Sequence, residues 1–293
     1  MACLKLFLWY NRKMITWRFL NPVQALDILS NKDEYIRRLN AFNLELHEVK
    51  SVEEYFENLP QHVFDWSEEQ IQNCQGSLAS VSQNLQDAGV ELDEEICLIL
   101  TNGKEMFNLE YTRGNAIIFP YASVSKFTDS KSDLFGFTET LIVHELFHVL
   151  SRKYPKIRTP LFKTFGFVEL ERDYLAMAYD EQIINPDALD HKWSIEVFDK
   201  KRSINIKGFP LIRKGDWKTF IEITDSGRLG EPMSIKDTNL FEKINKKLTQ
   251  YVSHPEEVAA EYFKIWICYP EKRNFKEIAK FSEEFLKQLK VKQ

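Results

Sequence analysis

His144, Glu145 and His148 form a His-Glu-x-x-His motif inside an apolar segment that runs from residue 141 to residue 150. Residues four positions apart lie on one face of a helix, so both imidazoles can bind a single metal ion. Glu145 lies one position further round, where its carboxylate can take a proton from water held by that ion. The spacing therefore predicts a divalent metal site with a general base beside it.

The residues around this motif favour a buried helix. Ser151 falls on the face of the two histidines, and apolar side chains cover the opposite face, namely Ile142, Val143, Leu146, Val149 and Leu150. A helix that is apolar nearly all round is normally buried. Burying two imidazoles and a carboxylate without partners is costly, and a divalent cation supplies the missing partner. The alternative is a helix whose polar groups only form hydrogen bonds within the protein.

A second helix with suitable side chains is expected over residues 255–267. Pro255 follows His254, and proline is typical of the first helical position. Glu257 and Glu261 are four positions apart on one face of a largely apolar helix. Their like charges repel each other unless a cation lies nearby, although a solvated acidic edge is the alternative. His254 fits either a helix cap or a site residue.

Together, the His-Glu-x-x-His motif and the later Glu-x-x-x-Glu helix resemble the thermolysin-like gluzincin metallopeptidases, whose second helix carries Glu-x-x-x-Asp. The resemblance implies a zincin-like fold in which His144, His148 and Glu257 bind one Zn²⁺ ion. It also implies that Glu145 is the catalytic base of peptide hydrolysis. Glu261 would then accept a hydrogen bond from His144 and fix the orientation of that ring.

Two further features of the family correspond less closely to this sequence. Asn115 and Ala116 begin a strand-like segment that is similar to the family's edge strand, which pairs with the substrate backbone; a buried strand is the alternative. The residue that stabilises the transition state is not fixed by the resemblance. Four side chains have suitable chemistry for that role: Tyr251, His254, Tyr262 and His191.

The chain also departs from known patterns. Glu261 stands where the family has Asp, and Glu256 stands where Asn often precedes the third ligand. The segment between the two helices is much longer than in compact members of the family. The metzincin class is excluded, because Ser151 and Tyr154 replace the Gly and His that its extended motif requires.

Two other functions stay open at this point. A zinc hydrolase of a non-peptide amide, such as a deformylase, uses the same motif with an upstream cysteine ligand in a Gly-Cys-x-Ser context. Cys97 precedes the motif but lacks that context. The other alternative is a zincin-like protein with a purely structural or inactive metal site. Glu145 argues against it, since a structural site has no need of that carboxylate.

Composition indicates an ordered globular protein. Of the 293 residues, 44% are hydrophobic and the net charge is −5, which argues against nucleic-acid binding. The sequence contains no apolar run of the roughly 20 residues that a membrane span needs. The apolar start lacks a charged segment and a cleavage site, so we expect no signal peptide. We therefore expect a cytoplasmic protein by default, with a peptide or protein substrate; secretion by another route and the oligomeric state stay open.

The four cysteines of the chain are widely spaced and form no Cys-x-x-Cys pair. Two of them, Cys97 and Cys268, lie in apolar stretches, where thiols usually pack as small hydrophobic groups. This usage is typical of a reducing compartment.

The order of elements predicts an α+β protein with two lobes. Residues 1–155 form an α/β lobe that ends in the helix with the His-Glu-x-x-His motif. Residues 156–293 form a mostly helical lobe, with a small β insertion at about 193–224 and the helix at 255–267 that carries the third ligand. Helices followed by a twisted sheet and then the motif helix are the order expected of a zincin-type fold.

Periodicity and capping residues give the boundaries of the smaller elements. In the first lobe we expect helices at 22–29, 33–42, 51 onward and 67–88, strands at 96–101, 107–111 and 116–120, and a motif helix capped by Thr138. In the second lobe we expect a helix at 161–179 interrupted by Gly166, strands at 193–198, 203–206 and 217–223, and helices at 239–252 and 275–289.

Overall fold

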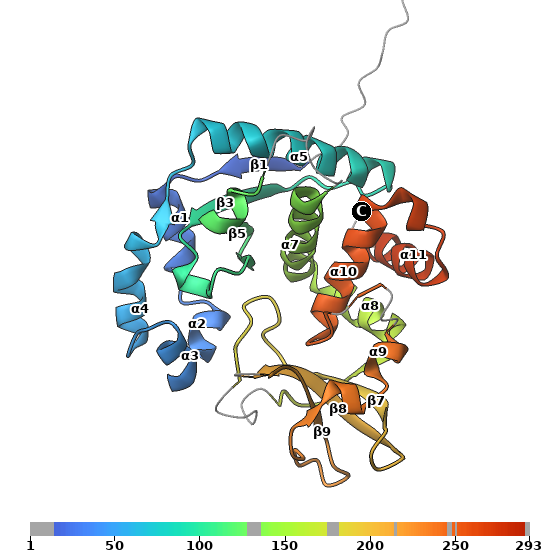
Figure 1. Ribbon diagram of the computed structural model, residues 1–293. Coiled ribbons are helices and arrows are strands. Elements are labelled where there is room, and N and C mark those ends of the chain that lie inside the picture. The colour runs from blue at the N-terminus through green and yellow to red at the C-terminus, as the bar shows by residue number, and fades with distance from the viewer. Residues whose placement is uncertain are drawn as a thin grey trace, which may run out of the picture.

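The computed structural model describes residues 15–127, 136–174, 182–213, 216–244, 248–249 and 251–290. Within these ranges the protein is α+β, with a mixed five-stranded sheet and helices towards the N-terminus, an antiparallel five-stranded sheet, and C-terminal helices (Figure 1). No helix in the described ranges is both long enough and apolar enough to cross a bilayer. The segment considered as a signal peptide lies outside the described residues.

The N-terminal sheet is built around a buried central strand, β3. Its strand order is β1-β3-β5-β4, and β2 pairs with the end of β3. The strands are β1 (Thr16–Phe19), β2 (Val63–Phe64), β3 (Glu95–Thr101), β4 (Tyr111–Arg113) and β5 (Ala116–Pro120). β1 and β5 run parallel to β3, whereas β2 and β4 are antiparallel to their neighbours. The apolar run of β3 is typical of a strand that is buried on both faces.

The side chains of β3 alternate between two apolar clusters, one on each face of the sheet. Leu98 and Leu100 join a cluster with α5 (Glu68–Asp87). Ile99 joins a cluster with short helices on the other face. These helices are α1 (Pro22–Leu29), α2 (Glu34–Arg38), α3 (Ala41–Leu46) and α4 (Val52–Asn58).

The helix expected over residues 33–42 is two helices. α2 ends at Arg38, and Asn40 begins α3 by accepting a hydrogen bond from the backbone N–H of Asn43 at 2.8 Å. Asparagine caps helices well because its side chain satisfies a backbone donor that has no partner within the helix. Local capping therefore divides the segment that was expected to form one helix.

Two long helices occupy the middle of the molecule (Figure 1). α7 (Phe137–Lys153) carries the His-Glu-x-x-His motif and packs against α10 (Pro255–Cys268), while α11 (Lys276–Lys290) covers them with Phe281 and Phe285. Thr138 was expected to cap α7, but this prediction is wrong. The position before the helix is Gly136, whose φ of 97° lies in the left-handed region that glycine adopts without strain.

The second sheet is antiparallel, with the order β10-β9-β8-β7-β6. Its strands are β6 (Phe167–Glu169), β7 (Trp193–Asp199), β8 (Ile204–Arg213), β9 (Asp216–Glu222) and β10 (Met233–Ser234). The helix expected over 161–179 is wrong after its first turn. It is α8 (Arg158–Thr164), and Gly166 at φ 89° then turns the chain into β6. Residues 175–179 lie outside the described ranges.

The helix expected over 239–252 is also shorter than the apolar pattern suggested. α9 covers only Leu240–Lys243, and the described residues 248–249 are not helical. Four strands and one helix had no counterpart in the expected elements: β1, β2, β6, β10 and the single turn α6 (Tyr121–Val124). All of these elements are short, so their periodicity is weak.

The largest apolar cluster contains residues from both halves of the chain. Leu98 of β3 and Phe147 of α7 belong to it, and so do Ile195 of β7 and Phe263 of α10. The division into lobes at 155/156 stays a prediction. For the site, the important consequence is that α7 and α10 are held in one packed core.

Candidate metal centre

The two histidines of the motif lie one helical turn apart on α7. Their ring centroids are 5.0 Å apart, and both side chains are buried. The opposite face of α7 holds Val143, Leu146 and Phe147 in the apolar core. Because the apolar face fixes the rotation of the helix, both imidazoles must point towards α10.

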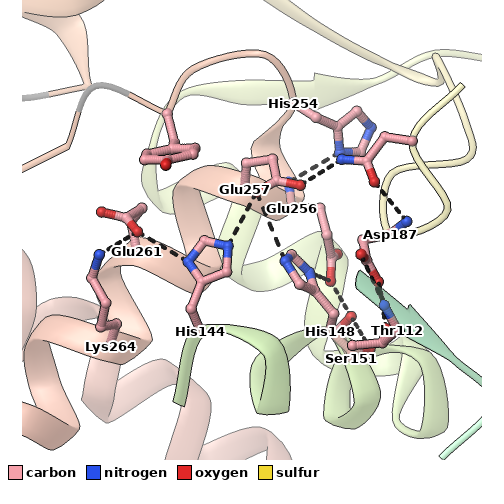
Figure 2. Close-up of polar contacts among 12 residues, drawn as sticks. Thr112, His144, His148, Ser151, Asp187, His254, Glu256, Glu257, Glu261 and Lys264 are labelled. Atoms are coloured by element: carbon pink, nitrogen blue, oxygen red, sulfur yellow. Dashed lines mark hydrogen bonds and ion pairs between the residues drawn. The ribbon is translucent and has the colours of Figure 1, made fainter. Parts of the chain in front are cut away.

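Glu257 of α10 faces both imidazoles (Figure 2). Its Oε2 lies 3.2 Å from His144 Nε2 and 3.8 Å from His148 Nε2. One donor atom from each of the three residues lies within 4.8 Å of the other two, so the group could hold a metal ion. Two imidazole nitrogens and one carboxylate oxygen are a donor set that catalytic zinc sites use. The residues present therefore fit a zinc ion.

The other nitrogen of His144 is also occupied. His144 Nδ1 lies 3.0 Å from Oε1 of Glu261, which in turn accepts a hydrogen bond from Lys264 at 2.5 Å. This is the contact that the resemblance implied for Glu261. It fixes the ring and favours the tautomer in which Nε2 is free to bind a cation.

Glu256 contacts Nδ1 of His148 in the same way. His148 Nδ1 lies 3.3 Å from Glu256 Oε1, and the hydroxyl of Ser151 donates to that oxygen (Figure 2). Arg158 Nε lies 3.5 Å from Glu256 Oε2. The sequence had marked Glu256 only as a departure from the family pattern. Ser151 was placed on the correct face of α7, but without a partner.

The buried charges of the site compensate one another. Burial opposes the protonation of His144, but hydrogen bonds to Glu257 and Glu261 raise its pKa to about 10. Burial likewise opposes the protonation of His148, and the carboxylates of Asp187, Glu257 and Glu256 raise its pKa to about 9. Burial raises the pKa of Glu257, yet the two histidines lower it to about 2. The acidic groups thus create a strong demand for positive charge at this position.

Glu145 is the buried carboxylate of the site that has no hydrogen-bond partner at one oxygen. Its side chain is 5% exposed, and Oε2 is buried and unpaired. Burial, with a further contribution from Asp187, raises its pKa above the usual range of a carboxyl group. A carboxylate whose pKa is raised in this way can accept and return a proton.

A turn from the segment before β7 completes the site, and its residues were not among the expected site residues. Asn185 donates a hydrogen bond to Glu257 Oε1 at 2.7 Å. Asp187 offers an oxygen within 4.8 Å of donor atoms of Glu145 and His148. Asn and Asp next to Pro186 are common turn residues, so nothing in their types alone pointed to the metal centre.

The three-ligand group opens onto a cavity of about 670 Å³. Its rim carries the exposed apolar side chains of Leu109, Phe137 and Tyr251. Tyr251 is 60% exposed, and its ring centroid lies 5.9 Å from that of His144. Of the four candidates for transition-state stabilisation, Tyr251 is therefore at the site.

The other three candidates for that role are engaged elsewhere. His254 caps α10: its Nδ1 accepts from the N–H of Glu256, and its Nε2 donates to the carbonyl of Asp190 at 2.9 Å. His191 is stacked on Phe209, and the Tyr262 hydroxyl donates to a backbone carbonyl. None of these three side chains lines the cavity.

The structure does not bring Asn115 and Ala116 to the cavity. Ala116 begins β5, which is paired with β3 on one side and β4 on the other, so β5 has no free edge for a substrate. Asn115 donates to the Glu95 carbonyl at 3.0 Å, beside the thiol of Cys97. The edge strand on this side of the sheet is β4, and β1 is the edge strand at the other end. Cys97 lies on β3, outside the His–His–Glu group.

No protein-family model, curated protein or solved structure matches this chain.

Proposed function

We propose that the protein is a zinc-dependent metallopeptidase. The observation that carries the proposal is the convergence of His144, His148 and Glu257 at an open cavity, with the unpaired carboxylate of Glu145 beside them. The resemblance to gluzincins supports the same function, because their ligand order and spacing within each helix are the same. In this proposal the mixed sheet with β4 at its edge, α7 and α10 form a zincin-like core.

Each group of the site has a distinct task in this proposal. A zinc ion, when bound, polarises a peptide carbonyl and acidifies water. Glu145 takes the proton from that water and returns it to the leaving amine. Glu261 and Glu256 hold the two imidazoles in place through their Nδ1 atoms. Tyr251, whose ring centroid lies 5.9 Å from that of His144, would donate to the developing oxyanion.

A purely structural metal site fits these observations less well. Structural zinc sites are closed by four protein ligands, whereas three ligands and an open position are typical of catalytic ones. Here the group has three donors and opens onto the cavity that Glu145 also lines. A deformylase-like site lacks its ligand, because Cys97 is held on β3 by packing and by contacts with Glu95 and Asn115.

The test is a peptidase assay on zinc-loaded protein with a mixture of unstructured peptides, read by mass spectrometry. The matched variant is Glu145→Gln, which keeps all three ligands and removes the base. We expect cleavage by the parent, loss of cleavage with a chelator, and zinc content without turnover in Glu145→Gln. Glu257→Ala should lose most of its zinc. Equal cleavage by the parent and Glu145→Gln would contradict the proposal.

A further inference from the structure

The outer edge of β4 is already occupied next to the metal centre. β4 pairs with β5 through one edge, and Thr112 directs its N–H and C=O towards the other. Both oxygens of Asp187 lie 3.2 Å from Thr112 N and accept from it, and Arg152 donates to Thr112 O. An edge strand ordinarily offers these groups to an added peptide strand. At Thr112 no such pairing is possible while the turn is in place.

Hydrogen bonds and an ion pair hold the turn that carries Asp187 in place. Asp187 also accepts from the Thr112 hydroxyl and pairs with Arg152 at 3.1 Å, and Arg152 donates to the Gly114 carbonyl. Asn185 Oδ1 accepts from Asp187 N at 2.9 Å, while its Nδ2 holds Glu257. The turn thus bridges β4, α7 and α10.

This turn separates two cavities along β4. Leu109 and Glu110 line the cavity of the metal centre, while Arg113 and Gly114 line a second cavity of about 680 Å³. Asp187 lines both. The turn therefore interrupts the groove along β4 between Glu110 and Thr112.

We propose that the turn Asn185–Asp187 is an end wall that makes the enzyme an aminopeptidase, an inference that rests on the proposed peptidase function. Peptides add to strand edges by backbone hydrogen bonds, and antiparallel pairing is the commoner arrangement. A peptide antiparallel to β4 runs from the Thr112 end towards Leu109. Its amino end therefore faces the wall, and its remaining length extends along Glu110 towards the open rim.

The distance between the end wall and the catalytic groups determines how many substrate residues fit between them. An oxygen of Asp187 lies within 4.8 Å of donor atoms of both His148 and Glu145. An extended residue advances about 3.3 Å along a strand. One residue fits ahead of the scissile bond, so the enzyme releases single amino-terminal residues.

The test compares three versions of one ten-residue peptide: both ends free, amino end acetylated, and carboxyl end amidated. Zinc content is measured first, and Glu145→Gln is run alongside. We expect stepwise release of amino-terminal residues from the free and amidated peptides. Acetylation should lower kcat/KM about 10- to 100-fold, because the added group meets the wall.

A variant of the end wall gives a second test that does not depend on the modified peptides alone. Asp187→Ala removes the group that blocks Thr112 N, and it should allow cleavage at internal bonds of the acetylated peptide. Asp225→Ala, on an exposed loop after β9, is the matched control and should behave like the parent.

Three results would overturn the inference: equal cleavage of acetylated and free peptides, cleavage at internal bonds by the parent, or release from the carboxyl end. If the zinc-loaded parent and Glu145→Gln both leave every peptide intact, the proposed peptidase function itself fails, and the inference falls with it. Zinc content distinguishes that outcome from an unloaded site.

Discussion

The contact between Glu261 and His144 gives a graded prediction for zinc affinity. Glu261 is buried, and its Oε1 lies 3.0 Å from His144 Nδ1. Losing a carboxylate behind a ligating histidine typically costs 10- to 100-fold in metal affinity, or about 1.4–2.7 kcal/mol. Glu261→Ala removes the acceptor and should fall near the upper value. Glu261→Gln keeps a neutral acceptor and should fall near the lower one, and Glu261→Asp should lose least.

The assay is competition for zinc against a fluorescent chelator at fixed pH and salt. Glu283→Gln, on the exposed face of α11, removes the same charge away from the site and should match the parent. Thermal unfolding of each metal-free variant shows whether the fold is intact. If Glu261→Ala binds zinc as tightly as the parent, the carboxylate does not orient His144 and the assignment by resemblance is refuted for this residue.

Three further predictions concern stability. Zinc at 100 times its dissociation constant should stabilise the parent by about 2.7 kcal/mol, seen as a higher unfolding midpoint in calorimetry, and should leave Glu257→Ala almost unchanged. Burial lowers the pKa of His47 to about 4, below its value of about 6.5 in the unfolded state. The unfolded state therefore binds more protons between these two pH values, and the free energy of unfolding should fall as the pH falls from about 6.5 to 4. Denaturant titrations across that range should give a flatter profile for His47→Gln; an equal slope would exclude this contribution. Phe147 packs in a cluster with Phe263 and Phe285, so Phe147→Ala should lower the free energy of unfolding in denaturant by about 3–5 kcal/mol. A loss below about 1 kcal/mol would mean that neighbouring side chains move in to fill the space left by the ring.

The helix that carries the metal motif could be predicted almost residue by residue. Its spacing places His144 and His148 on one face whatever the rest of the fold, and a long apolar helix has a strong period. The shared face of Glu257 and Glu261 followed from the same logic, because Pro255 fixes the start of α10. The role of Glu257 as a metal ligand was implied by the resemblance to gluzincins alone. These predictions rely on interactions within one helix, which a sequence displays directly.

The partners that reach the site from elsewhere could not be predicted in the same way. Asn185 and Asp187 contact α10, α7 and β4 only because the chain folds back after α8. Such contacts depend on tertiary packing, and turn-forming residue types do not reveal them. The helix expected up to residue 179 failed for a related reason. Gly166 redirects an apolar segment into a sheet edge, and sheet pairing overrides helical propensity there.

A crystal structure of the zinc-loaded protein, with an anomalous difference map at the zinc absorption edge, tests the central claim most directly. The account predicts one peak, about 2.0–2.2 Å from Nε2 of His144, Nε2 of His148 and a carboxylate oxygen of Glu257. A peak held instead by Asp187 and Glu145, or zinc bound only at the surface while the three residues keep their direct hydrogen bonds, would contradict it.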